Sequence, residues 1–197
     1  MTARLSARDR ILETAFRLFY ANGIRGVGVN KIIAESDVAK DTLYKHFKSK
    51  DELVLAYLDR ADVAWLGALR TAAQAAGPRP RDQLVGMFDA LDSACRRDGY
   101  HGCAFINTAA EVPPGSPVHA RTVAHKQAVR DWVHQLSAQA GAGDPDALSG
   151  GLTLILDGAL AAGVLDADPT VPAAAARAAA ALVDAGCPAD RRGGKQR

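Results

Sequence analysis

The sequence predicts an all-α protein, and three observations support this prediction. Long stretches are rich in Ala and Leu and show almost none of the alternation of β-branched residues that is typical of strands. The 9 prolines gather in a few short segments, which leaves long runs free to form helices. Hydrophobic residues make up 48% and charged residues 23% of the 197 residues, which is ordinary for a globular protein with one or two cores.

Positive charge is concentrated in the amino-terminal part of the chain. Residues 1–60 hold 11 Lys and Arg against 8 Asp and Glu, whereas residues 61–190 hold 9 against 14. A basic segment on an acidic body favours an anionic partner, although this excess of positive charge is modest.

Several classes of protein are not expected. The three cysteines, Cys95, Cys103 and Cys187, show no metal-ligand spacing, and their odd number argues against a disulfide framework. The first ten residues hold no apolar run, so we expect no signal peptide and a cytoplasmic location. The most apolar run, residues 151–165, is interrupted by Asp157 and is short for a bilayer, so no membrane partner is expected. The sequence lacks a phosphate loop, a zinc-protease motif and a nucleophile elbow, so neither an enzyme nor a cofactor nor a metal site is predicted.

Capping signals mark the first helix. Ser6 with Asp9 has the spacing of a capping box, and Asn22–Gly23 supplies a stop, so a helix is expected over residues 7–21. The apolar residues between these signals fall on one stripe, so this helix is expected to pack the two short helices that follow.

The two short helices are separated by a tight turn. The second helix is expected over residues 30–35, with Ile33 and Ala34 facing the core. The turn Ser36–Asp37–Val38 needs a positive φ at its centre, where Gly is usual and Asp is tolerated.

The third helix, expected over residues 40–47, carries more polar and aromatic side chains than a packed core needs. Helical spacing places Leu43 and Phe47 on its buried side. The remaining side chains project outward or lie on the flanks, where a helix in a major groove contacts bases and phosphates. They are Asp41, Thr42 and Lys45 outward, and Tyr44 and His46 on the flanks. The alternative is a helical hairpin buried in a bundle, but four lysines of residues 40–50 would then lie in a core.

Ser49 caps a long fourth helix, and residues 42–53 read TLYKHFKSKDEL. This string resembles the signature of the TetR/AcrR family of bacterial regulators. The resemblance implies an all-α fold with an amino-terminal three-helix helix-turn-helix domain, here residues 1–50. A larger helical ligand-binding and dimerisation domain would cover residues 51–190, followed by a disordered basic tail over residues 191–197. Two positions depart from the family pattern: Asp37 replaces a turn Gly, and Ala39 replaces a capping Ser or Thr at a cost of about 1 kcal/mol.

The resemblance also implies which residues face DNA. Tyr44 and Lys50 would hold phosphates, and the others would lie near bases or the backbone. Lys45 can donate hydrogen bonds to the major-groove edge of guanine. Asp41 can accept a hydrogen bond from cytosine or can serve only the amino terminus of its own helix. The expected DNA-binding residues are Asn30, Lys31, Lys40, Asp41, Thr42, Tyr44, Lys45, His46 and Lys50.

Beyond the fourth helix, further helices are expected over residues 81–95, 103–111, 118–140, 145–165 and 172–185. The last two are so rich in Ala, Gly and Leu that they have too little polar surface to face water alone. They are expected to pack against the same helices of a second copy, giving a homodimer, which is also what the family resemblance implies.

A small-molecule site is expected in the carboxy-terminal domain. The apolar candidates can equally be ordinary core residues, and His125 can equally be solvated or a helix cap. Glu111 is a further candidate polar contact. The expected ligand-binding residues are Trp65, Phe88, Leu91, Cys103, Phe105, Asn107, His125, Trp132 and Asp157. Cys103 is either a thiol sensor or a small buried residue at a helix start.

These observations predict a homodimeric transcriptional regulator, most simply a repressor released from a palindromic double-stranded DNA operator by a small-molecule effector. The alternative is a DNA-binding dimer without a small-molecule pocket, controlled by thiol oxidation or by a protein partner.

Overall fold

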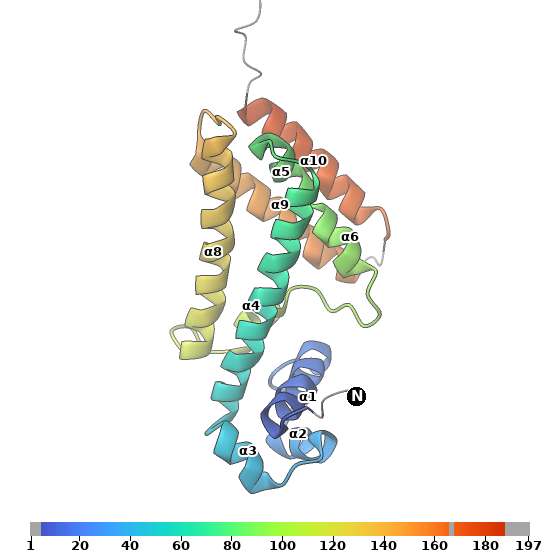
Figure 1. Cartoon of the computed structure of the whole chain (residues 1–197), viewed down its shortest axis with the longest axis vertical. Coiled ribbons are helices and arrows are strands. Elements are labelled where there is room, and N and C mark those ends of the chain that lie inside the picture. The colour runs from blue at the N-terminus through green and yellow to red at the C-terminus, as the bar shows by residue number, and fades with distance from the viewer. Residues whose placement is uncertain (1–4, 166–167, 188–197) are drawn as a thin grey trace, which may run out of the picture. The chain divides into compact units, whose positions relative to one another are not determined.

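The computed structural model describes residues 5–165 and 168–187, and every regular element among them is a helix (Figure 1). The all-α prediction is therefore confirmed. The predicted tail, residues 191–197, lies outside the described residues. The helices are α1 (Ala7–Asn22), α2 (Val29–Ser36), α3 (Lys40–His46), α4 (Lys50–Ala75), α5 (Pro80–Gly86), α6 (Asp89–Cys95), α7 (Ala104–Glu111), α8 (Pro117–Gln139), α9 (Pro145–Leu165) and α10 (Val171–Gly186).

Packing divides the chain into two compact units, whose boundaries fall inside α4 and α8. One unit takes in the chain up to Trp65 together with Cys103–His125. The other takes in Leu66–Gly102 together with the described residues from Lys126 onward. The first unit therefore holds α1, α2, α3, α7 and the first parts of α4 and α8. The expected functional boundary near residue 50 is a separate matter and stays a prediction.

Local capping bonds form at the predicted helix ends of the first unit. The Asp9 amide donates to Ser6 Oγ at 3.1 Å at the start of α1. Gly23 ends α1 with a φ of 73°, and its amide donates to the Phe19 carbonyl. At the start of α4, the Glu52 amide donates to Ser49 Oγ at 3.1 Å. These bonds satisfy backbone groups that a helix end otherwise leaves unpaired.

Aromatic contacts hold α4 against α1. The Tyr57 ring lies edge-on to Phe16 and Phe19, with ring centroids 5.2 and 5.7 Å apart. Tyr57 is 2% exposed, so the first part of α4 belongs to the same core as the three short helices. The guanidinium of Arg60 covers the outer side of this cluster, 5.2 Å from the Phe16 ring centroid.

The second unit is built around α9 and α10, which pack along each other. Helices α5 and α6 pack on α10, and α6 also contacts α9, as the green, orange and red ribbons of Figure 1 show. Small residues permit this close packing: a Cβ added at Gly151 of α9 would lie 2.6 Å from Leu182 Cδ2 of α10.

The helix predicted over residues 81–95 is wrong in one respect, because the structure has two helices there. Backbone bonds at the junction have the shorter spacing of a 3₁₀ turn, from the Phe88 amide to the Val85 carbonyl and from the Ala90 amide to the Met87 carbonyl. Gly86 lies at the break, where a Cβ would come 2.3 Å from Ala76 Cβ. Close approach to α4 therefore redirects the chain, and periodicity alone does not reveal such a break.

One expectation about which side chains face the core is also wrong. In α2, Ile32 is fully buried, whereas Ile33 is half-buried and Ala34 is exposed. Two apolar residues, Val63 on α4 and Val123 on α8, are 75% and 54% exposed. The helical phase that faces the core is set by the neighbouring helices, and a run with apolar residues on several faces does not specify it.

Candidate nucleic-acid interface and regulatory region

The turn between α2 and α3 has the conformation that the sequence predicts. Asp37 lies in the left-handed region, with φ 51° and ψ 53°, and is the only described residue other than glycine with a positive φ. An Asp at this position costs less than most residues because its short polar side chain tolerates the left-handed region. Ser36 Oγ donates to the Ile32 carbonyl at 2.6 Å, and Arg10 of α1 donates to the Asp37 carbonyl at 3.3 Å.

Helix α3 is held by its two apolar residues. Leu43 and Phe47 are each 1% exposed, as predicted, and the Arg8 guanidinium lies 5.2 Å from the Phe47 ring centroid. Ala39 precedes α3 without a side-chain capping bond, in keeping with the departure seen in the sequence. Burial of Leu43 and Phe47 therefore fixes which side of α3 faces solvent.

The predicted DNA-binding residues lie on the solvent side of α2, α3 and the start of α4. Asn30, Lys31, Lys40, Asp41, Tyr44 and Lys45 are exposed, whereas Thr42, His46 and Lys50 are half-buried. Tyr44 keeps 42% of its surface exposed although it is aromatic. This arrangement presents hydroxyl, ammonium and amide groups from one short helix and its supports, which are the groups that contact phosphates and base edges.

Lys50 and Arg10 have contacts that the sequence did not reveal. The Lys50 ammonium donates to the Ile24 carbonyl at 2.6 Å, so this cation also supports the loop between α1 and α2. Arg10 was not predicted as a site residue, yet it supports the turn through Asp37. The only indication of this role in the sequence is that Arg10 follows the helix cap Ser6 by about one helical turn.

A second polar cluster in the same unit joins α4, α7 and α8. The rings of His125 and Phe105 are stacked, with centroids 3.5 Å apart and planes 7° from parallel. His125 is 1% exposed, so a solvated role on α8 is wrong, and its Nδ1 is bonded to an Asp62 oxygen. Arg121 forms ion pairs with Asp59 at 2.7 Å and Asp62 at 3.0 Å.

The charge of Asp62 is favoured by this cluster. Burial by itself would raise the pKa of Asp62, but hydrogen bonds from His125 and Arg121 and their charges outweigh burial. The pKa of the Asp62 carboxyl is therefore held below its ordinary value. A carboxylate kept ionised between α4 and α8 ties the amino-terminal parts of these helices together.

The nine predicted ligand-binding residues fall into two sets. Trp65, Cys103, Phe105, Asn107 and His125 belong to the first unit. Phe88, Leu91, Trp132 and Asp157 belong to the second unit. Most are buried or half-buried, but Asn107 is exposed, and Asp157 pairs with Lys126 at 2.5 Å. The sequence did not predict the partners of His125 and Asp157, because they lie far away along the chain.

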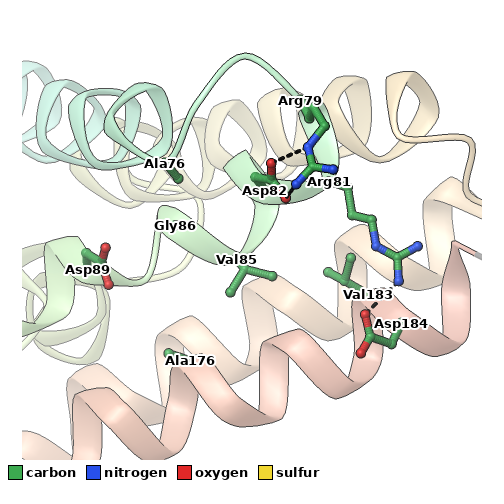
Figure 2. Close-up of a pocket in the computed structure, with 10 residues that line it drawn as sticks. All are labelled: Ala76, Arg79, Arg81, Asp82, Val85, Gly86, Asp89, Ala176, Val183 and Asp184. Carbon is green, nitrogen blue, oxygen red and sulfur yellow. Dashed lines mark hydrogen bonds and ion pairs between the residues drawn. The ribbon is translucent and has the colours of Figure 1, made fainter.

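A shallow cleft of about 500 Å³ opens in the second unit along α5 and α10, and Figure 2 shows its walls. Two ion pairs cross or border it, Arg79–Asp82 and Arg81–Asp184, each at 2.6 Å. None of the predicted ligand-binding residues lines this cleft. Both guanidinium groups and two of the three carboxylates at its walls form these ion pairs, so this charged cleft differs from the apolar effector site that the sequence predicts.

The fold and the exposed α3 define a helix-turn-helix DNA-binding protein. The sequence model described as "Bacterial regulatory proteins, tetR family" matches residues 11–57, which include α2, the turn and α3. A crystal structure of a TetR-family transcriptional regulator from Streptomyces coelicolor is 40% identical, with a TM-score of 0.86. That match covers 92% of this chain and 96% of the other. The chain belongs to the TetR family, and it is a DNA-binding transcriptional regulator and not an enzyme.

Two relatives from Escherichia coli (strain K12) are also transcriptional regulators. The HTH-type transcriptional regulator YjdC is 26% identical over 162 residues, which cover 78% of this chain and 81% of YjdC. The HTH-type transcriptional repressor NemR is 26% identical over 106 residues, which cover 53% of each chain.

Helix α9 is long and apolar enough to cross a membrane by length and composition alone. It has 21 residues and a mean hydropathy of 1.7 in its most apolar window, of which 39% is buried within the chain. The expectation that the apolar run is too short is therefore wrong in length, because the helix extends back to Pro145. One such helix is a weak indication of a membrane span, since core helices pass the same test.

Proposed function

We propose that this regulator is a homodimeric repressor that binds a palindromic operator in the cytoplasm and is released by a small-molecule effector. The observation that supports it most is the exposed row of Tyr44, Lys45 and Lys40 on a helix anchored by buried Leu43 and Phe47. Two copies of α3 related by a twofold axis would enter successive major grooves, with half-sites spaced by about 10 bp or a multiple of it.

Variants of α3 test the assignment of DNA contacts. We expect Tyr44→Phe combined with Lys50→Ala to weaken binding to all DNA sequences, because phosphate contacts carry no sequence information. Lys45→Ala should instead relax the preference at one base pair, with a loss of about 1–3 kcal/mol in discrimination. The measurement is a competition assay with the duplex that the wild-type protein selects from a random library, at fixed salt.

The control for this test is Arg70→Ala, since Arg70 is an exposed cation of the second unit that is not proposed to touch DNA. Its affinity for the selected duplex should equal that of the wild-type protein. If the Tyr44, Lys45 and Lys50 variants also bind like the wild-type protein, the proposed reading surface is incorrect.

The proposed dimer would form through α9 and α10. Leu154, Gly158, Ala161 and Leu165 follow one another at helical spacing on α9, and all four are exposed in the single chain. A Cβ added at Gly158 would meet nothing within 4 Å, so no other part of the chain covers the stripe at this position. An exposed apolar stripe of this length favours an interface with a second copy.

The proposed effector would act on the unit that also contains the helix-turn-helix. Phe105 and His125 provide an aromatic and a polar group side by side, and Cys103 directly precedes the helix that carries Phe105. The predicted ligand-binding residues of this unit, which belong to this proposal, are Trp65, Cys103, Phe105, Asn107 and His125. An effector that binds better to the conformer with lower DNA affinity would shift the dimer off the operator.

Thiol oxidation is the second candidate for control. Cys103 is a free cysteine, and the solved NemR structure, which is 20% identical, is of the reduced form of that protein. Cys103 is only 9% exposed, which favours the small-molecule mechanism because a sensor thiolate needs access to the oxidant.

The substitution Cys103→Ser separates these two candidates. We expect hydrogen peroxide to leave DNA binding of the wild-type protein and of the variant unchanged, because the thiol is buried. A thermal-shift screen with hydrophobic and cationic compounds should raise the melting temperature of both proteins, through binding to the folded state. Release of the wild-type protein by peroxide, together with resistance of Cys103→Ser, would instead establish thiol control.

A further inference from the structure

A single carboxylate links α7 to the loop between α1 and α2. Glu111 is the last residue of α7, and its Oε2 accepts a hydrogen bond from the Arg25 amide at 2.6 Å. The two residues are 86 positions apart in the sequence, and both belong to the first compact unit. A bond from an amide to a charged carboxylate is among the stronger hydrogen bonds in proteins.

The same loop is held from another side by α4. The Lys50 ammonium donates to the Ile24 carbonyl at 2.6 Å, next to the amide that Glu111 binds. Within the loop, the Val27 amide donates to the Ile24 carbonyl at 3.4 Å. Two side chains from α4 and α7 therefore fix neighbouring backbone groups of a short, otherwise locally bonded loop.

This loop sets where α2 begins. Gly28 precedes α2 and has no side chain with which to cap it, so the start of α2 depends on the path of the chain before it. Helix α2 and the Asp37 turn in turn support α3, because α1, α2 and α3 pack together in one core. The path of the chain at Arg25 therefore affects where α2 lies, and α2 packs against the helix that carries the proposed DNA contacts.

Gly23 leaves room for the Glu111 side chain. Its φ of 73° already favours glycine, and a Cβ there would lie 2.4 Å from Glu111 Oε1. The carboxylate therefore occupies the space that the absence of a side chain leaves at the end of α1. Glycine at position 23 therefore meets two requirements: a positive φ, and close approach of a side chain from a distant segment.

We infer that Glu111 is a positioning residue for DNA binding, which acts through the loop of residues 23–28 on α2 and α3. Helix α7 also carries Phe105 and directly follows Cys103, so displacement of α7 would withdraw the carboxylate from the Arg25 amide. The positioning role rests on DNA binding, and only the effector response rests on the proposed function.

Substitutions at Glu111 measure this role. We expect Glu111→Ala to lower affinity for the duplex selected by the wild-type protein by about 10- to 150-fold, from the usual strength of a hydrogen bond to a charged group. Glu111→Gln keeps an acceptor oxygen at the same reach and should stay within about 3-fold of the wild-type affinity. Glu111→Asp shortens the side chain by one methylene and should lose affinity although the charge is kept.

Hydrogen exchange distinguishes positioning from a general loss of stability. In the wild-type protein, duplex binding should slow exchange of the α7 amides, because coupling between two sites is reciprocal. This protection should disappear in Glu111→Ala and persist in Glu111→Gln. The control is Glu13→Ala, which removes another carboxylate of the same unit from a surface ion pair with Arg60 at 2.5 Å and should keep the protection.

The possible outcomes are separable. If the wild-type protein selects no duplex, DNA binding itself fails. If it selects one but Glu111→Ala and Glu111→Asp bind it like the wild-type protein, or α7 protection survives in both, the positioning role is overturned. Should Glu111→Ala not fold, the folded Glu111→Asp variant decides by the same two measurements.

Discussion

Phe47→Ala is expected to lower the free energy of unfolding by about 3–5 kcal/mol and to abolish DNA binding. Phe47 is 1% exposed and ends α3, so its removal leaves a cavity at the point where the DNA-facing helix meets its core. A domain of ordinary stability has only about 5–15 kcal/mol in total, so this loss is a large share of it. The Arg8 guanidinium would also lose the ring that it covers at 5.2 Å.

Urea unfolding at matched protein concentration measures this loss, because the concentration also affects the stability of any dimer. The control is Lys48→Ala, the next residue along the chain, whose side chain is exposed. Lys48→Ala should change the free energy of unfolding by no more than about 0.5 kcal/mol. A loss of less than about 1 kcal/mol for Phe47→Ala would contradict the role of this residue as the anchor of α3.

Leu154→Asp is expected to convert the proposed dimer into monomers and to reduce operator affinity by about 100-fold or more. An aspartate at the centre of an apolar interface would be buried without a partner, which costs several kcal/mol. A monomer would also lose the gain from two linked half-sites, each of which binds weakly alone. Analytical ultracentrifugation measures the mass, and a gel-shift assay with the selected duplex measures the affinity.

Val63→Asp is a matched control for this change. Val63 and Leu154 are both 75% exposed in the single chain. Val63 lies on α4 and is not part of the α9 stripe. Val63→Asp should therefore keep the dimer mass. If Leu154→Asp remains a dimer, a surface that does not include Leu154 joins the two copies.

The amino-terminal unit was predictable to a large extent because its signals are local. Ser6 with Asp9 and Ser49 with Glu52 each place a cap within three residues of the group that it binds. Asp37 at the turn likewise reports a backbone conformation through its own residue type. The family signature over residues 42–53 then supplied the function of the helix that these signals delimit.

Predictions that depended on helical phase were less accurate. The burial of Ile32 and the exposure of Ala34 follow from which neighbours α2 meets. The break between α5 and α6 follows from the close approach of Gly86 to Ala76, ten residues earlier and just after the end of α4. Such contacts involve residues that no local pattern connects.

The sequence by itself determined the helical class, the helix-turn-helix with its left-handed Asp37, and the buried pair Leu43 and Phe47, because hydrophobic period, caps and turn chemistry act over a few residues. Only the tertiary structure decided that Glu111 binds the Arg25 amide and that Asp62 binds His125. The first pair is separated by 86 positions and the second by 63, so each pair meets only when the chain has folded.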